Sequence, residues 1–281
     1  MAGTAWRLVR GGDFGRLREA RLQAHYALQW LARAARAFVP PRPEDLHTNL
    51  DWDDTFDGFV THPLTDDLRL GLRIPDLTLV LGSLSAQASF TLDGRTDGDA
   101  RLRLGELLAA HDLDPARLDA KPPYEIPDHA VAHGAAYDAR GSSDALSDLA
   151  AWFANADRSL GRVRETMIAR GLAPSPVRTW PHHFDVATFT LLEGGNAEHA
   201  RSVNAGLSPG DEHYEEPYFY VSPYPYPDAT RLPALPFGHW HTRGFTAAVL
   251  PASKIIAMSD RQATGDDFLD AAVAAAIRAL A

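Results

Sequence analysis

The chain has 281 residues, of which 45% are hydrophobic and 9% aromatic. This composition excludes wholesale disorder and is sufficient for a large buried core. The net charge of −10 argues against a general nucleic-acid-binding protein, which needs surplus cations to contact phosphates, and the absence of cysteine excludes disulfides, thiolate metal sites and a cysteine nucleophile.

Several local features bear on location and partners. The apolar runs, such as residues 271–277, are too short to span a membrane, and residues 1–12 lack the apolar stretch of a signal peptide. Only Lys121 and Lys254 are lysines, so arginine carries almost all the positive charge, as in proteins of GC-rich bacterial genomes. We therefore expect a cytoplasmic bacterial protein with neither a membrane nor a nucleic acid as partner.

In the first part of the chain, apolar residues at helical spacing predict a helix from Asp13 to about Val39, which Pro40 ends. Its arginines give the first 42 residues a charge of +6, which we interpret as a solvated face rather than an anion site. Leucine alternates with polar residues or glycine over 68–74, which indicates a half-buried strand. With runs at 77–81 and 88–92 it predicts an antiparallel meander within residues 56–92.

In the remainder, the pattern predicts a turn at 93–99, a helix over 101–111, a proline-rich loop at 121–141 and a long helix from Ser142 or Ser143 to Gly171. Strands are expected at 184–192, 218–221 and 245–250, a short helix at 197–203, and a final helix capped by Thr264. These elements predict an α+β fold, with antiparallel sheet and long helices at the N-terminus, middle and C-terminus. We expect one domain over residues 1–281, which would have two lobes meeting near residue 140 if it is divided.

Three motifs match a known pattern only as strings. Residues 206–210 read G-x-S-x-G, but a nucleophile elbow needs the backbone N–H that Pro209 lacks, so we expect a turn. The aspartates at 51–57 resemble a calcium loop, but Phe56 and His62 stand where that loop needs Gly and Glu, which favours a solvated acidic loop. The triplet at 97–99, Asp-Gly-Asp, is typical of a hairpin turn.

Six of the twelve histidines lie between residues 180 and 245. Residues two apart in an extended chain point to the same side, so His183 should face with Asp185, and His239 with His241. Two histidines and a carboxylate are the ligand set of non-haem iron oxygenases, and they also suit a hydrolytic zinc site. The sequence therefore predicts a zinc or iron site; its expected ligands are His183, Asp185, His239 and His241, and its candidate general bases are Glu212 and Glu215. The competing interpretation is that these histidines only bind backbone groups.

Nine aromatic residues lie between Tyr214 and Phe245, among many prolines. Rigid loops that display tyrosine and tryptophan beside carboxylates can form the wall of a site for a small polar or cationic molecule. We expect Tyr218, Tyr220 and Trp240 to form such a wall. Packing of the same rings into the core is the alternative.

The chain also resembles a bacterial family defined only as a domain of unknown function. The resemblance rests on Ser-Pro-Val at 175–177, Phe-Asp-Val-Ala at 184–187, the glycines and prolines of 205–210, and a tyrosine–proline run with Pro217, Tyr220, Tyr224 and Pro225. Further similarity lies at His25, Trp30, His47 and Phe59. It implies a single full-length domain and no particular activity. Arg178 stands where that family has histidine, and His182 and His183 replace small residues.

These observations favour a metal-dependent enzyme, of hydrolytic or non-haem oxygenase type, that acts on a small organic substrate. One alternative is a non-catalytic protein whose aromatic loop binds a small ligand or a partner. Another is an interaction protein that uses the arginine-rich first helix.

Overall fold

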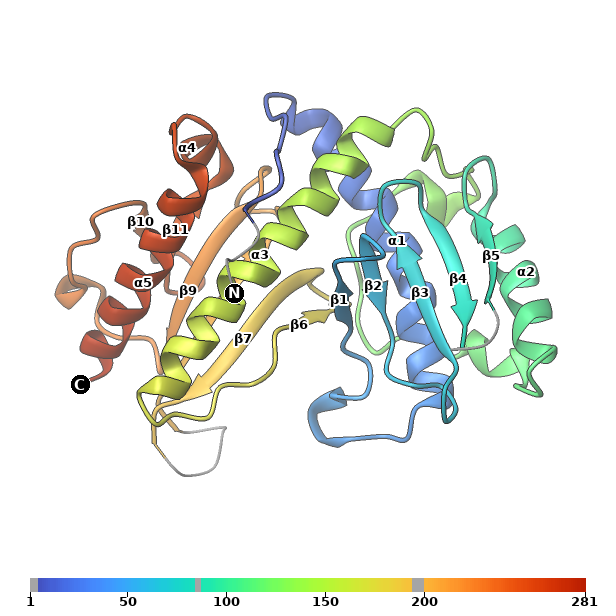
Figure 1. Ribbon diagram of the computed structural model, residues 1–281, viewed down its shortest axis with the longest axis horizontal. Coiled ribbons are helices and arrows are strands. Elements are labelled where there is room, and N and C mark those ends of the chain that lie inside the picture. The colour runs from blue at the N-terminus through green and yellow to red at the C-terminus, as the bar shows by residue number, and fades with distance from the viewer. Residues whose placement is uncertain (1–4, 84–86, 194–199) are drawn as a thin grey trace. The chain divides into compact units, whose positions relative to one another are not determined.

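The structure is a computed structural model, which describes residues 5–83, 87–193 and 200–281. The chain divides into two compact units (Figure 1): unit 1 comprises residues 1–14, 151–178 and 185–281, and unit 2 comprises residues 15–150 and 179–184. The elements confirm the expected α+β class, because antiparallel sheets combine with long helices at the N-terminus, in the middle and at the C-terminus. Among the described residues, none of the helices combines the length and apolar character needed to cross a membrane.

The helix α1 (Phe14–Phe38) forms where the apolar spacing predicts it. Leu17, Ala24, Leu28 and Leu31 are buried along one stripe, and the helix stops before the proline pair at 40–41. The stripe buries Trp30 as well, and its indole N–H donates to the Asp97 carboxylate at 3.0 Å. A short 3₁₀ turn, η1 (Pro43–Asp45), follows.

The sheet of unit 2 is an antiparallel meander in the order β1-β2-β3-β4-β5, which confirms the predicted arrangement. Its strands are β1 (Asp51–Asp53), β2 (Gly58–Val60), β3 (Arg69–Arg73), β4 (Thr78–Gly82) and β5 (Gln87–Thr91). Leu70, Leu72, Leu79 and Leu81 are buried on one face. The acidic segment 51–57 is not all loop as predicted, since Asp51–Asp53 pairs with Gly58–Val60 as the edge strand.

The helix α2 (Asp97–Ala109) begins before the predicted position. Thr96 accepts a hydrogen bond from the Asp99 backbone while the Asp99 carboxylate accepts from the Thr96 N–H, a capping box that nucleates the first turn. The Asp-Gly-Asp triplet is therefore helical, and the predicted hairpin turn is wrong. The 3₁₀ turns η2 (Pro115–Asp119) and η3 (Ala130–His133) lie within or beside the predicted loop.

The helix α3 (Ser143–Ala169) begins in unit 2 and continues in unit 1, while β6 (Arg178–Trp180) contains another boundary between the units. In unit 1 the sheet runs in the order β10-β11-β9-β8-β7. These strands are β7 (Asp185–Leu191), β8 (Ser202–Ser208), β9 (Tyr218–Tyr224), β10 (His239–His241) and β11 (Ala247–Pro251), with η4 (Ala229–Arg231) before β10.

The strand β8 corrects two predictions. The helix expected over 197–203 is a strand from Ser202, and residues 197–199 lie outside the described residues. The G-x-S-x-G string is not simply a turn, because its first three residues end β8 and pair with β7 and β9. Its serine is thus part of a strand, and no helix follows it.

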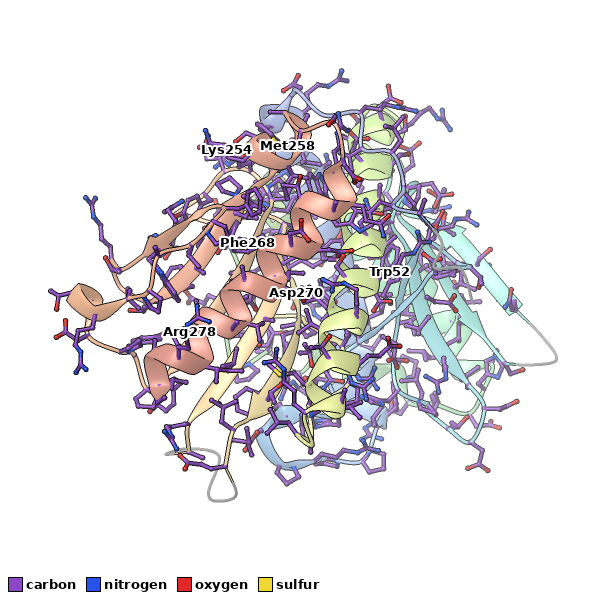
Figure 2. All side chains as sticks on the ribbon, turned by 60° about the vertical axis from the view of Figure 1, so that its left-hand side comes forward. Trp52, Lys254, Met258, Phe268, Asp270 and Arg278 are labelled. Atoms are coloured by element: carbon purple, nitrogen blue, oxygen red, sulfur yellow. The ribbon has the colours of Figure 1, made fainter. Side chains whose placement is uncertain are left out.

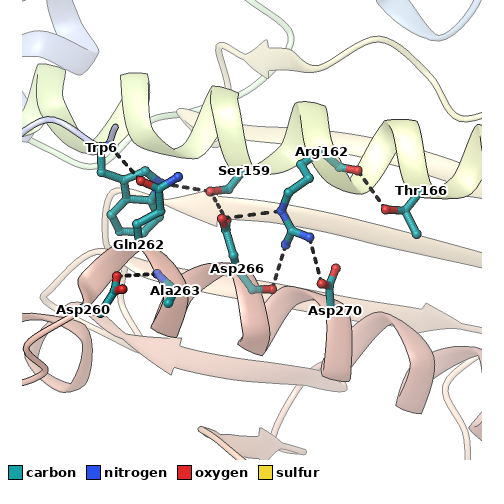
Figure 3. A network of polar contacts seen from close by, with 9 residues as sticks. All are labelled: Trp6, Ser159, Arg162, Thr166, Asp260, Gln262, Ala263, Asp266 and Asp270. Carbon is teal, nitrogen blue, oxygen red and sulfur yellow. Dashed lines mark hydrogen bonds and ion pairs between the residues drawn. The ribbon is translucent and has the colours of Figure 1, made fainter. Parts of the chain in front are cut away.

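The helix α5 (Arg261–Leu280) packs against β8, β9 and β11, and the short α4 (Ala252–Ile256) precedes it. Figure 2 labels the core residue Phe268 and the more exposed Asp270 and Arg278 along α5. Asp260, rather than Thr264 as predicted, caps the helix by accepting from the Ala263 N–H at 2.9 Å. Figure 3 shows how α5 is held to α3: Arg162 contacts Asp266 and Asp270, with 2.8 Å between its Nη1 and the Asp270 carboxylate.

Candidate functional site

The strand register places most of the predicted site residues of unit 1 on one face of its sheet. His239 pairs with Val249, which pairs with Tyr220, which pairs with Gly206. Paired residues share a face and alternate residues return to it. We call this the histidine–tyrosine face and define it by Asp185, Tyr218, Tyr220, His239 and His241. Phe219 lies on the opposite face, where its ring is 5.9 Å from that of Trp6.

The centre of the histidine–tyrosine face is Tyr214, which comes from the turn before β9. Its hydroxyl oxygen lies 2.9 Å from Nε2 of His239 and 3.0 Å from Nδ1 of His241. Two imidazole nitrogens from one strand thus converge on a single oxygen atom. This confirms that the two histidines face together, as their spacing predicts.

The hydrogen bonds fix the protonation pattern of this triad. Nε2 of His241 lies 2.7 Å from the carbonyl oxygen of Arg243, which can only accept, so Nε2 carries the hydrogen. Nδ1 of neutral His241 is then an acceptor, and the Tyr214 hydroxyl donates to it. His239 must therefore donate its Nε2–H to the Tyr214 oxygen. The hydrogen bonds therefore run in one direction, from His239 to Tyr214 and from Tyr214 to His241.

The surroundings favour the uncharged forms of His239 and Tyr214. Burial lowers the pKa of His239, and the neighbouring His241 lowers it further. Burial also raises the pKa of the Tyr214 hydroxyl, with a smaller contribution from the negative charge of Asp211. These shifts favour a neutral imidazole at His239 and a protonated phenol at Tyr214 near neutral pH.

Two features hold the cluster in place. The Asp211 carboxylate accepts from the backbone N–H groups of His213 and Tyr214 at 2.8 and 3.0 Å, and from the Tyr218 hydroxyl at 2.5 Å. At the start of β10, Gly238 has φ +71°, and a Cβ there would lie 2.3 Å from the carbonyl oxygen of Val249. Only glycine fits at this position, so Gly238 sets the path that brings His239 to Tyr214.

A second polar pair lies on the same face. The Tyr220 hydroxyl donates to the Asp185 carboxylate, and the ring crosses β8 at Gly206 to reach it. A Cβ on Gly206 would lie 2.5 Å from the Tyr220 hydroxyl oxygen and 2.7 Å from the carbonyl oxygen of Val186. Burial raises the pKa of Tyr220 well above its usual value, and the Asp185 charge adds to the effect. Tyr220 therefore stays protonated and acts as a donor.

The predicted aromatic wall is divided by the strand geometry. Tyr218 and Tyr220 share the histidine–tyrosine face, but both hydroxyl groups already bind carboxylates. Trp240 alternates with His239 and His241 in β10, so it points to the other face, where its indole N–H donates to the Pro233 carbonyl at 2.7 Å. The three side chains do not form one continuous wall.

The predicted bases lie in the turn that carries Tyr214. Glu212 and Glu215 are both exposed. The Glu212 carboxylate is 3.6 Å from Nε2 of His213, whose ring lies 5.2 Å from that of His241. Glu212 is thus the predicted base that the structure brings close to the histidine cluster.

His183 lies in a different environment from the other three predicted ligands. Residues 181–184 form a turn in unit 2, and Phe184 has φ +59°, so the chain is not extended between His183 and Asp185. The rule that residues two apart share a side therefore does not apply there. The His183 ring is 4.1 Å from that of His182, and nearby His25 stacks on Phe184 at 5.0 Å.

The described residues contain no group of three or more histidine, aspartate or glutamate side chains arranged to hold a metal ion. The donors that converge are two histidines and Tyr214. Sequence reasoning placed Tyr214 in the aromatic region but did not select it. The spacing of Asp211 and Tyr214, which suits a turn closed by the aspartate side chain, is the signal that could have identified it.

Comparisons of the chain with protein-family models, with curated proteins and with solved structures found no match.

Proposed function

We propose that unit 1 is a metal-dependent enzyme of hydrolytic type that acts on a small organic substrate, with His239, His241 and Tyr214 as metal donors. The observation that carries this proposal is the convergence of Nε2 of His239 and Nδ1 of His241 on the Tyr214 oxygen. This set replaces the ligand set expected from the sequence, since the turn at 181–184 removes the extended geometry that would face His183 with Asp185, and Asp185 is bound by Tyr220.

The chemistry of the donors fits a borderline metal ion such as zinc. Neutral imidazole is a common zinc ligand, and metal-bound histidines usually donate their second ring N–H to a carbonyl or carboxylate. His241 makes that second contact with the Arg243 carbonyl. When bound, the ion would supply a Lewis acid and a water molecule of lowered pKa.

The chain's own residues would then divide the remaining work. His239 would move its hydrogen from Nε2 to Nδ1, and Tyr214 would release its proton to become a phenolate donor. Asp211 would hold the turn through its three hydrogen bonds. Glu212, exposed beside His213, is the candidate to accept a proton from the nucleophile.

The test is a calorimetric titration of the metal-free chain with Zn²⁺, repeated with Co²⁺ to follow its absorption. We expect one equivalent to bind, and His239→Ala and His241→Ala to weaken binding at least about tenfold, because each removes a ligand and loss of a residue that only supports a ligand already costs about tenfold. His183→Ala and His111→Ala, an exposed histidine of unit 2, should leave affinity unchanged. Because Tyr214 releases a proton on binding, affinity should rise with pH, and less so in Tyr214→Phe.

Equal binding by wild type and His239→Ala would refute the proposed donors, and loss of binding only in His183→Ala would restore the original set. If the wild type binds no metal, the proposal fails.

A second candidate, a non-catalytic ligand-binding protein, is favoured by one observation. Tyr224, Tyr226 and Phe237 lie in or beside the proline-rich segment between β9 and β10 and are 44%, 53% and 38% exposed. Exposed aromatics on a stiff segment can bind a flat or apolar molecule. A ligand screen by thermal shift, with Tyr224→Ala and Tyr226→Ala as controls, tests this candidate whatever the outcome of the metal titration.

A further inference from the structure

The sheet of unit 2 carries a groove on the face opposite its buried leucines. The groove has a volume of about 600 Å³, within the range of small-molecule sites. It crosses all five strands, and its lining includes Asp53, Phe56, Asp66, Asp67, Arg69 and Gly71. The lining residues all belong to unit 2, whereas the histidine–tyrosine face belongs to unit 1.

The groove is deep at its centre because Gly71 has no side chain. Gly71 faces it from β3, and a Cβ there would lie 2.9 Å from Cε1 of Phe56 and 3.3 Å from Cγ1 of Val60. Glycine at this position therefore lets the Phe56 ring lie against the strand. The ring, with Val60 and Val80, supplies an apolar and aromatic surface inside the groove.

The charge of the groove is negative. Three carboxylates, those of Asp53, Asp66 and Asp67, line it against the single guanidinium of Arg69. That guanidinium is held in place, since its Nη1 donates to the Thr61 carbonyl oxygen at 2.8 Å. Asp66 and Asp67 are exposed and belong to the turn between β2 and β3.

We infer that this groove binds a small organic cation, an amine or a guanidinium. Carboxylates pair with such a group by charge and hydrogen bonding, and an aromatic face adds attraction through its quadrupole. An anionic ligand would meet three like charges. A neutral ligand would gain hydrogen bonds but no charge–charge attraction from the carboxylates, so charge complementarity favours the cation.

The experiment is calorimetric binding of agmatine, which carries both cationic groups, with N-butylurea as a neutral probe of similar length. We expect agmatine to bind and N-butylurea not to bind. The double variant Asp66→Asn/Asp67→Asn should weaken the binding of agmatine at least about fivefold, since it removes two exposed ion pairs that each contribute a modest free energy. Binding should also weaken as salt is raised.

The matched control is Asp112→Asn/Glu125→Gln, which removes the same two charges from exposed positions of unit 2 that do not line the groove. It should change affinity less than twofold. Phe56→Leu keeps an apolar side chain but loses the aromatic face, and should weaken binding about two- to fivefold. Thermal melting of each variant verifies that it is folded.

Three results would overturn the inference: no agmatine binding by the wild type, equal binding of the neutral probe, or equal weakening in the two double variants. None of them depends on the metal titration. The agmatine experiment can therefore refute the cation groove without affecting the proposed metal donors, and the metal titration can refute the donors without affecting the groove.

Discussion

Replacing Gly206 by alanine tests the arrangement of the histidine–tyrosine face. The new Cβ would lie 2.5 Å from the Tyr220 hydroxyl oxygen and 2.7 Å from the Val186 carbonyl oxygen, both far inside van der Waals contact. The backbone of β7 cannot yield easily because it is paired with β8 on that side. The Tyr220 ring must move instead, and its hydroxyl must leave Asp185.

The cost has two parts. Forcing an extra carbon into a packed site costs about 1–3 kcal/mol, and losing a hydrogen bond to a charged group costs about 1.5–3 kcal/mol. Because the two parts overlap, we expect Gly206→Ala to lower the free energy of unfolding by about 2–4 kcal/mol. Tyr220→Phe removes the hydroxyl bond to Asp185 that Gly206→Ala would break, although its ring carbon Cζ stays 2.6 Å from the new Cβ. The double variant should therefore show a favourable coupling of about 1 kcal/mol.

The assay is guanidinium denaturation followed by circular dichroism, with Gly161→Ala as the matched control. Gly161 lies in α3, and a Cβ there would meet nothing within 4 Å. Alanine should stabilise that helix by about 0.5–1 kcal/mol, the opposite sign to Gly206→Ala. A cost below about 0.5 kcal/mol for Gly206→Ala would contradict the steric reasoning.

Three further predictions concern stability. Burial lowers the pKa of His25 to about 4, so the unfolded state, with a pKa near 6.5, takes up the proton first, and the free energy of unfolding falls by about 3 kcal/mol as the pH drops from 6.5 to 4. His25→Gln should reduce this pH dependence in denaturation curves measured across the same range. An unchanged pH dependence would exclude His25 as its source. Thr96→Ala removes the side-chain half of the α2 capping box and should cost about 1 kcal/mol by chemical denaturation, whereas no change would mean the cap is not formed. Phe268→Ala leaves a cavity at a buried position between α5 and the sheet and should lower the free energy of unfolding by about 3–5 kcal/mol. A decrease below about 1 kcal/mol in the same denaturation assay would contradict this.

Periodicity predicted the long helices and the meander because their apolar patterns are regular. The apolar stripe on α1 and the alternation in β3 predict which side of each element is buried, and the structure buries those sides. The errors fall where a side chain, rather than a pattern, decides the local fold. The Thr96–Asp99 capping box turns Asp-Gly-Asp into a helix start, and Asp260 rather than Thr264 supplies the cap of α5.

The strand β8 was missed for a different reason. Its residues include Gly206 and Ser208, which are small and have low strand propensity, and the sequence 202–208 contains only one β-branched residue, Val203, and no aromatic residue. Long-range pairing with β7 and β9 on both sides fixes its conformation. A single-sequence pattern contains no information about such pairing.

The site was predicted in part. The spacing of His239 and His241 correctly indicated that they face together, because β10 is a regular strand. The same rule does not apply to His183 and Asp185, because Phe184 adopts a left-handed conformation and the chain between them is not extended. Tyr214 was not selected because its position depends on the hydrogen bonds of Asp211, which no periodicity reports.

The two sheets use one device to place an aromatic ring beside a carboxylate. Phe56 lies against Gly71 in β3 of unit 2, and Tyr220 crosses Gly206 in β8 of unit 1; both are interior strands. In each case a side chain larger than hydrogen would meet the ring or its hydroxyl within 3 Å. The chemistry then differs by one atom: the Tyr220 hydroxyl binds Asp185 directly, while the Phe56 ring has no polar group to engage a carboxylate. The proposed cation groove of unit 2 therefore has no aromatic hydroxyl to engage its carboxylates, whereas Tyr220 of unit 1 already donates to Asp185, which leaves the histidines and Tyr214 as the proposed metal donors of that face.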